Sequence, residues 1–300
     1  MKSENWECRF TLTGARLIIA SERSTVDAGI SKRRWEILLD KILYFFTTGI
    51  ICNSRYSSKA LVENLRFKRE KVFTVYNGLN FLEYQNKFSD GASFRRDKIR
   101  IGTVGRIYAV KNHKLFLDAA RFILQKRKRE DYEFHIVGDG PMNQEVQEYA
   151  RKLNIQDSVV FHGEKNNVPE ILQTFDVFVI TSDYEGLSNA IMEAMLTGLP
   201  VVATAVGGNS ELVREGQTGF LCPAGDAEAI AGKITELIDR PDLARQFGER
   251  GRKKILREFS TPKMVRNTEE IFCRLIRKTY NSSLNLCSAN KSFPTEKTKL

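Results

Sequence analysis

The sequence is poor in the residues that build metal centres and disulfide frameworks. It has 5 cysteines and 3 histidines; no two cysteines form a Cys-x-x-Cys pair, and the histidines are not spaced as metal ligands. It also lacks a clear Asp-x-Asp motif, and Asp183-Tyr184-Glu185 is the nearest approach to one. We therefore expect no bound metal and reduced thiols, which are typical of a cytoplasmic compartment.

Long hydrophobic runs are also lacking. The most apolar stretch, Ile42 to Cys52, is too short to cross a bilayer and is interrupted by two threonines. The first nine residues are charged and contain no apolar segment, so we expect no signal peptide. These absences favour a cytoplasmic protein without a membrane-spanning helix.

The basic charge is unevenly placed along the chain. The net charge is +10, with an excess of Lys and Arg in residues 1–100 and 263–300 and a slight acidic excess between them. General solubility explains this pattern as well as attraction to an anionic partner does. We set nucleic acid aside because aromatic and basic residues are not interleaved in a readable motif.

An anionic membrane remains a possible partner, with peripheral contact at the inner face of the cell membrane. Apolar residues follow the basic run Lys32-Arg33-Arg34, although a helix that faces the protein core explains them equally well. The residues concerned are Trp35, Leu38, Ile42 and Phe45.

Short apolar runs alternate with helical patterns, which predicts an α/β fold with parallel sheets. The predicted strands are Ala15–Ala20, Gly49–Cys52, Val72–Tyr76, Ile99–Val104, Phe134–Val137, Ser158–Phe161, Val177–Ile180, Pro200–Ala203 and Gly219–Cys222. The clearest helices are His113–Lys126, Asn143–Leu153 and Thr261–Tyr280.

A polar Gly/Ser-containing segment near Phe88–Lys98 divides the chain. Residues 96–262 form a complete doubly wound pattern, whereas residues 1–95 offer only three strands and form an incomplete Rossmann-like domain. We expect the helix at 261–280 to return to the N-terminal domain, and residues 281–300 to be a disordered polar tail.

The motif that points most directly to chemistry is Tyr184–Met195, a loop and short helix between two predicted strands. Such a loop lies where open α/β sheets bind ligands, and unpaired amides at a helix start can hold an anion. Glu185 and Glu193 can accept hydrogen bonds from sugar hydroxyls. A nucleotide-sugar needs amides that bind its phosphates and carboxylates that bind its hydroxyls. Taken alone, Glu193 would instead be interpreted as a solvent-exposed residue of an amphipathic helix.

Three further motifs follow predicted strands. Each has a plain alternative: surface charge for the first, a tight turn for the second and a buried strand end for the third. They are Gly105-Arg106 with Lys111, Gly138-Asp139-Gly140-Pro141, and Phe161-His162-Gly163.

In this order, these motifs resemble the retaining GT-B glycosyltransferases of family 4. The resemblance covers nearly all of residues 96–262, and Glu185 with Glu193 matches the E-x7-E pattern. Later residues continue it, as Pro200–Gly208, Glu211 and Gly219-Phe220-Leu221. The N-terminal stretch around Ser21-Glu22-Arg23 is similar to the later half of the family's acceptor domain, in members that build bacterial surface polysaccharides and lipid-linked oligosaccharides.

The resemblance implies a GT-B fold of two Rossmann-like domains. It also implies transfer of a sugar, with retention, from a nucleotide-diphosphate sugar to a glycan or polyprenyl-diphosphate-linked acceptor. The donor is a substrate, UDP-sugars are the favoured class, and no cofactor is expected.

It further implies roles for individual residues. Arg106 and Lys111 would hold the donor diphosphate as the leaving group, and Glu185 would contact the transferred sugar. Glu193 would hold the ribose hydroxyls. The remaining donor-binding residues would approach the phosphates, the sugar or the base: Gly105, Gly138, Phe161, His162, Gly163, Gly186, Leu187, Ser188 and Asn189.

The sequence also departs from the family. The glycine-rich loop that opens the family's N-terminal domain is absent, and Glu22 falls where many relatives carry a histidine. Glu22 is either a base or, as we favour, a structural acid. A homologue that binds nucleotide-sugar with little or no turnover is the alternative function.

A glycosidase carboxylate pair is the rival mechanism for Glu185 and Glu193. On one continuous helix, eight residues would separate their backbones by about 12 Å. That is too far for a retaining hydrolase, which needs its carboxyl groups close together, although the side chains could narrow the distance.

Overall fold

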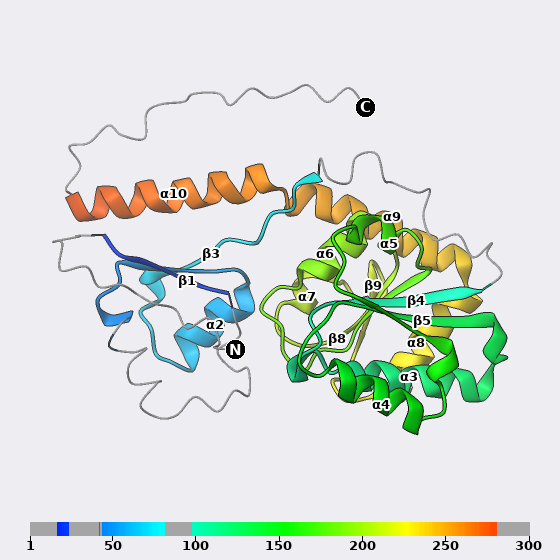
Figure 1. Ribbon diagram of the computed structural model, residues 1–300. Helices are drawn as coiled ribbons and strands as arrows, with labels where there is room; N and C mark the ends of the chain where they lie inside the picture. Colours follow the sequence, from blue (N-terminus) through cyan, green and yellow to red (C-terminus); the bar gives the residue numbers. More distant parts are fainter. Residues whose placement is uncertain (1–16, 24–41, 43, 82–97, 281–300) are drawn as a thin grey trace.

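The computed structural model describes residues 17–23, 42, 44–81 and 98–280. It contains two parallel sheets, one of three strands in the order β1-β2-β3 and one of six in the order β6-β5-β4-β7-β8-β9. We name them, with their helices, the small unit and the large unit; Figure 1 shows the small unit in blue and cyan beside the large one. The predicted α/β architecture with two Rossmann-like parts is confirmed.

The large unit is doubly wound around β4. Successive strands extend from β4 through β5 and β6 on one side and through β7, β8 and β9 on the other, so the strand order reverses between β4 and β7. The strands are β4 (Ile99–Val104), β5 (Tyr132–Val137), β6 (Val159–Gly163), β7 (Val177–Ile180), β8 (Val201–Thr204) and β9 (Gly219–Cys222). Ligands of such sheets bind at this reversal, outside the carboxyl ends of the strands.

Helices cover both faces of the large sheet (Figure 1). One face is covered mainly by α3 (His113–Lys126), α4 (Asn143–Lys152) and α8 (Ala227–Asp239). The other is covered by α5 (Val168–Leu172), α6 (Asn189–Leu196), α7 (Asn209–Leu212) and part of α9 (Pro241–Glu258). All four residues of β7 are buried, which explains its uninterrupted apolar sequence.

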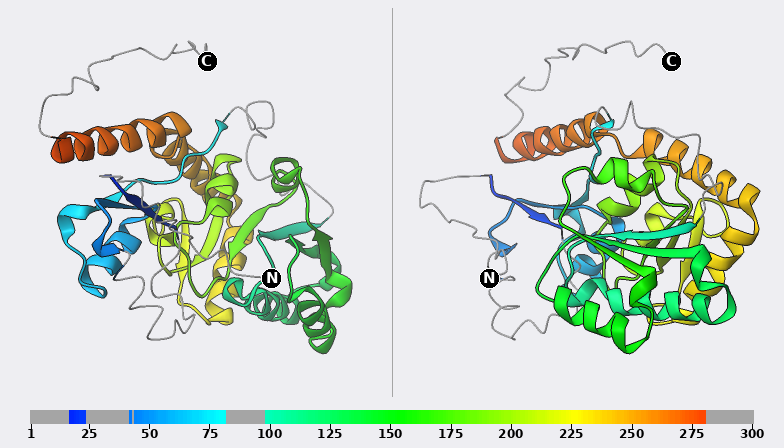
Figure 2. Two further views of the ribbon diagram at one scale, coloured as in Figure 1. Left: turned by 60° about the vertical axis from the view of Figure 1, so that its left-hand side comes forward. Right: turned by 45° about the vertical axis from the view of Figure 1, so that its right-hand side comes forward.

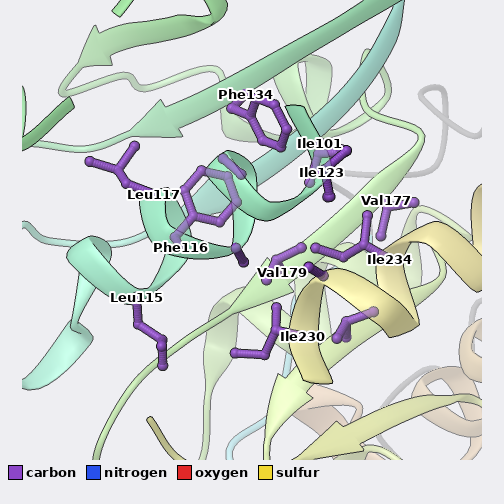
Figure 3. Packing of buried hydrophobic residues seen from close by; sticks show 14 of the residues in the cluster. Ile101, Leu115, Phe116, Leu117, Ile123, Phe134, Val177, Val179, Ile230 and Ile234 are labelled. Atoms are coloured by element: carbon purple, nitrogen blue, oxygen red, sulfur yellow. The ribbon is translucent and has the colours of Figure 1, made fainter. Parts of the chain in front are cut away.

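Aromatic and branched side chains fill the core beneath α3 and α8. Figure 3 shows Phe116 beside Phe134, with Ile101, Val177 and Ile234 packed around them. The rings of Phe116 and Phe134 meet edge to face, 6.1 Å between centroids. This apolar packing fixes the strands whose carboxyl ends carry the candidate site.

The small unit consists of β1 (Ile19–Glu22), β2 (Gly49–Cys52), β3 (Val72–Thr74) and α2 (Arg55–Glu63). Ser54 caps α2 because its side chain accepts a hydrogen bond from the Ser57 amide. The prediction of a strand over Ala15–Ala20 was wrong in position. The strand starts at Ile19 and ends at Glu22, since these residues pair with Gly49 and Cys52 of β2.

Helix α10 (Thr261–Tyr280) leaves the large unit and runs along the small sheet, as Figures 1 and 2 show. Leu275 is buried there, and a Cβ on Gly49 of β2 would lie 2.7 Å from its Cδ1 atom. The guanidinium of Arg274 lies 5.5 Å from the ring centroid of Phe73 in β3. The last helix therefore completes the packing of the first sheet.

Several sequence predictions fall outside the described residues. These are the domain boundary at 95/96, most of the segment near Phe88–Lys98, the tail at 281–300, and Trp35 and Leu38. Across the described part of the chain, no helix combines the length and the apolar character that are needed to span a membrane.

Candidate functional site

The predicted glycines lie together at the carboxyl ends of β4, β5 and β6. The amide of Gly105 donates to the carbonyl of Val137, and the amide of Gly138 donates to the carbonyl of Gly163, both at 2.9 Å. Gly138 has a φ of +134°, and a Cβ there would lie 2.1 Å from the Gly105 oxygen. Only a glycine at position 138 allows these backbone segments to approach so closely.

Lys111 and Glu185 form an ion pair at the reversal point of the sheet. The Lys111 Nζ lies 2.6 Å from Glu185 Oε1, and the Ser182 hydroxyl donates to the same oxygen at 2.7 Å. Only 7% of the Glu185 residue is exposed, while Lys111 is half-buried. The two residues predicted to handle diphosphate and sugar are thus held in direct contact.

Asn112 ties the loop of Lys111 to the loop of Glu185. Its backbone is left-handed, with φ 46° and ψ 52°, and its side chain caps α3 by accepting from the Leu115 amide. Its Nδ2 donates to Asp183 Oδ1 at 2.9 Å, and the Asp183 amide donates to the Val110 carbonyl. Asn112 was not predicted as a site residue, although an asparagine directly before a helical pattern is a typical capping signal.

The backbone of Glu185 is held from the loop that follows β8. The amide of Gly208 donates to the Glu185 carbonyl at 3.3 Å. Gly207 has a φ of +52°, and a Cβ there would lie 1.7 Å from the same oxygen. The Gly207-Gly208 pair therefore lets two loops touch, which accounts for this part of the sequence motif.

The second acid of the motif lies on α6, whereas the first does not. Ser188 caps α6 through a hydrogen bond from the Ile191 amide, so the helix starts at Asn189. Glu193 is half-buried one turn along, and Glu185 precedes the helix. The separation calculated for one continuous helix therefore does not apply to this pair.

The side chains around the predicted base-binding strand end point in different directions. Phe161 packs against the core of the large unit, while His162 Nε2 lies 2.9 Å from His135 Nδ1. The two imidazoles stack with 5.2 Å between their centroids. Burial lowers the pKa of His135 to about 4 and also lowers that of His162, so both rings are neutral near pH 7.

The two predicted cations differ in their surroundings. Arg106 is exposed, with its guanidinium 5.3 Å from the ring centroid of Tyr108. Lys111 precedes the buried His113 by two residues, and the pKa of His113 is lowered to about 4, mainly by burial and to a smaller extent by the Lys111 charge. Among the described residues no group of three or more His, Cys, Asp or Glu could hold a metal ion.

We name residues 185–189, which lead from Glu185 to the start of α6, the donor loop. The small unit covers it. A Cβ on Gly186 would lie 2.5 Å from the Arg23 carbonyl oxygen, and Asn77 Nδ2 donates to Asn189 Oδ1 at 2.9 Å. Leu187 is buried in the core beneath α6. Residues from both units therefore meet at this loop.

Glu22 closes the first strand of the small unit and is buried. Its Oε2 accepts a hydrogen bond from the Tyr44 hydroxyl at 3.0 Å. The carbonyl of the next residue, Arg23, accepts from Asn53 Nδ2 at 3.2 Å. These bonds tie the end of the first strand to Tyr44 and Asn53, and the choice between a structural acid and a base for Glu22 stays a prediction.

Comparison with known proteins agrees with this arrangement. The family described as glycosyl transferases group 1 matches residues 85–254. The chain is 33% identical over 154 residues to N-acetyl-alpha-D-glucosaminyl L-malate synthase of Bacillus anthracis, covering 51% of this chain and 40% of that enzyme. It is 28% identical over 257 residues to the UDP-Gal:alpha-D-GlcNAc-diphosphoundecaprenol alpha-1,3-galactosyltransferase of Escherichia coli, covering 82% and 66%.

Among solved structures, the complex of Anabaena HepE with UDP superimposes with a TM-score of 0.77 at 22% identity, covering 86% of this chain and 72% of HepE. At that identity the likeness shows a shared fold. The chain spans less than two thirds of the length of each of the two curated relatives.

Proposed function

Because the chain belongs to the glycosyl transferases group 1 family, we propose that it transfers a sugar from a nucleotide-diphosphate sugar to a glycan or lipid-linked acceptor. UDP-sugars are the favoured donors, and retention is the expected stereochemical outcome. The names of relatives support this choice, since one uses UDP-Gal on a diphosphoundecaprenol acceptor and HepE was solved with UDP. Synthesis of a cell-surface polysaccharide is the process that we propose for it.

The observation that carries the proposal is the Lys111–Glu185 pair beside the donor loop. An ammonium group has three N–H donors, so Lys111 can hold Glu185 and phosphate oxygens together. Departure of the nucleoside diphosphate concentrates negative charge there, and a fixed cation stabilises that charge. Glu185 in turn presents its carboxylate to the hydroxyls of the sugar.

Glu193 and the glycine-lined strand ends complete the proposed donor site. Glu193 would take the ribose hydroxyls, and Arg106 would add a second positive charge at the diphosphate. The close backbone segments at Gly105, Gly138 and Gly163 would form the wall against which the base lies. Donor binding would need no metal.

Titration calorimetry in the presence of a chelator tests this proposal. We expect UDP to bind more tightly than GDP or ADP, and Lys111→Met to weaken UDP binding at least tenfold. Glu193→Ala should cost on the order of 1–3 kcal/mol of binding free energy. Glu249→Ala is the matched control, because Glu249 is an exposed residue of α9.

Unchanged UDP affinity in the Glu193 variant would remove Glu193 from the ribose role. Failure of all three nucleotides to bind would refute the proposed function. Binding of UDP without transfer to any glycan or polyprenyl-diphosphate acceptor would favour the alternative, a homologue with little or no turnover.

We further propose that the small unit contacts an anionic membrane, at the cytoplasmic face where a lipid-linked acceptor would be presented. Phe45 and Phe46 are 77% and 56% exposed and meet edge to face, with 5.5 Å between ring centroids. Lys71 Nζ donates to the backbone carbonyls of Phe45 at 3.4 Å and Thr47 at 2.7 Å, which places a cation at the backbone of this aromatic segment. Aromatic rings next to basic residues suit the interface of an anionic bilayer.

Flotation with vesicles tests the membrane contact. We expect binding to vesicles that contain phosphatidylglycerol and little binding to phosphatidylcholine alone. Phe45→Ser with Phe46→Ser should reduce this binding, whereas Tyr184→Ser, at an exposed residue of the large unit, should not. Equal binding of the Phe45/Phe46 variant and the Tyr184 variant to the anionic vesicles would contradict the proposed membrane contact of the small unit.

A further inference from the structure

One carboxylate of the large unit reaches across to the small unit. Glu211 of α7 accepts hydrogen bonds from the Arg55 amide at 3.0 Å and the Tyr56 amide at 2.8 Å. The Tyr76 hydroxyl also donates to it, at 2.8 Å. Two amides of the small unit and the hydroxyl of Tyr76, which follows β3 and also packs on Phe259 of the large unit, therefore converge on one side chain that lies far away in the sequence. We name Glu211 and these three donors the interdomain clamp.

The chemistry of the clamp follows from the N-terminus of α2. Arg55 and Tyr56 are its first two residues, so their amides have no partner within the helix. The cap residue Ser54 receives the amide of Ser57 and serves neither of them. A carboxylate at this end of a helix is stabilised by charge-assisted hydrogen bonds and by the helix dipole.

The other end of the clamp is anchored in the large unit. Lys254 of α9 is 6% exposed, and its Nζ donates to the carbonyls of Glu211 and Leu212, the latter at 2.6 Å. Burial lowers the pKa of Lys254 to about 8. These bonds hold the carbonyl end of α7, so Glu211 extends from a fixed base.

Glu211 follows closely on a residue that contacts the donor loop. Gly208, three residues before Glu211, donates to the Glu185 carbonyl. From the small unit, Arg23 and Asn53 approach Gly186, since a Cβ there would lie 2.5 Å from the Arg23 oxygen and 3.2 Å from both Asn53 amide atoms. The loops that follow β1 and β2 therefore meet the donor loop near the point where Glu211 joins the two units.

We propose that Glu211 is a positioning residue that fixes the small unit over the donor loop. The inference rests on the proposed function, because it assigns Glu211 to the alignment of acceptor and donor. Glycosyl transfer needs the acceptor oxygen against the anomeric carbon, and a small misplacement lowers the rate by orders of magnitude. Glu211 acts on this alignment through the backbone of α2 and touches no reacting atom.

Three variants of the full chain test the proposal. Glu211→Ala removes the carboxylate, Glu211→Gln keeps its shape without the charge, and Tyr76→Phe removes the hydroxyl donor while keeping the ring. Glu249→Ala is again the control. The measurements are amide hydrogen exchange at Arg55 and Tyr56, small-angle scattering, UDP affinity, and the kcat and KM for sugar transfer.

In Glu211→Ala we expect the two amides to exchange at least tenfold faster and the scattering profile to report a more extended molecule. The kcat should fall at least tenfold, while UDP affinity and donor KM change less than threefold. Glu211→Gln and Tyr76→Phe should lie between Glu211→Ala and the wild type. A merely structural residue would change folding stability without this separation of kcat from KM.

The outcomes separate this inference from the proposed function. Failure of UDP, GDP and ADP to bind to the wild type refutes the proposed function, whereas exchange and scattering still report on the clamp. Unchanged exchange and scattering in Glu211→Ala would overturn the positioning role, even where UDP binds normally. An equal kcat in that variant would overturn it as well.

Discussion

The ammonium of Lys111 lies 2.6 Å from the carboxylate of Glu185, although 74 residues separate them in the chain. The carboxylate is almost fully buried and also accepts the Ser182 hydroxyl. Neither residue can therefore be replaced without consequence for the other. Comparison of a single variant, which leaves one charge, with a double variant, which removes both, therefore separates the effect on folding stability from the effect on nucleotide binding.

Lys111→Met should lower both stability and nucleotide affinity. Removing Lys111 leaves the buried Glu185 carboxylate without its cation, and since Lys111 is itself half-buried we expect a cost of about 1–3 kcal/mol. The double variant Lys111→Met with Glu185→Gln removes both charges and should recover most of that stability, but not UDP binding. Urea denaturation and calorimetry on the same samples check this. Recovery of UDP affinity in the double variant would contradict the phosphate role of Lys111.

Gly207→Ala should lower folding stability by more than the cost of its left-handed backbone conformation, because the added Cβ collides with the donor loop. Its φ is +52°, and the new Cβ would lie 1.7 Å from the Glu185 oxygen. Gly216→Ala is the matched control, because its φ is +66° but nothing lies within 4 Å of the added Cβ. The control should lose about 1–2 kcal/mol from the left-handed conformation.

Gly207→Ala should lose more stability than this control and should also weaken UDP binding. Thermal denaturation and calorimetry give the comparison. Equal losses in the two alanine variants would mean that the contact between the Gly207 and Glu185 loops carries no energy.

Asn112 offers a test of the bond between the two loops. Asn112→Gly tolerates the left-handed backbone but loses both the helix cap and the bond to Asp183. Asn112→Ala loses the same bonds and adds backbone strain. We expect a loss of about 1 kcal/mol in the glycine variant, mainly from the bond to Asp183, and a further loss in the alanine variant. Both should weaken UDP binding, and a glycine variant with wild-type affinity would argue against the loop coupling.

His113 should make the fold sensitive to mild acid. Its folded pKa is lowered from 6.5 to about 4. Its contribution to stability is therefore complete above pH 6.5 and is lost as pH falls toward 4, because the unfolded chain takes up the proton first. At pH 5 the loss attributable to this residue is about 2 kcal/mol.

Urea denaturation at pH 7.5 and pH 5 measures the effect of His113. The wild type should lose more stability between these pH values than His113→Gln does. The pKa of His135 is lowered as well, so the His113→Gln variant should retain part of the pH dependence of stability. An identical loss in wild type and variant would exclude His113 as a source.

Local sequence was sufficient where apolar runs coincide with buried strands. The predicted strands Gly49–Cys52, Ile99–Val104, Val177–Ile180 and Gly219–Cys222 and the helix His113–Lys126 are confirmed to the residue. The first strand was misplaced, because its polar end is buried by pairing with β2 and by the Tyr44 bond to Glu22. Hydrophobic pattern alone cannot anticipate such a partner.

The sequence motifs predicted where the site lies, but they did not predict which side chains contact one another there. The family and the place of the Glu185–Glu193 motif at a strand end are confirmed. The Lys111–Glu185 pair and the bonds of Glu211 to α2 depend on residues brought together by tertiary folding. The catalytic and binding roles assigned to these residues stay predictions.

The path of α10 has a consequence for biosynthesis. Leu275 packs on Gly49, so one face of the first sheet is closed by a helix that leaves the ribosome only after the whole large unit. During translation an apolar face of the early strands therefore stays exposed until α10 is synthesised, and this face can bind chaperones or cause aggregation. We therefore expect the large unit to fold first and to act as the platform on which the N-terminal strands mature.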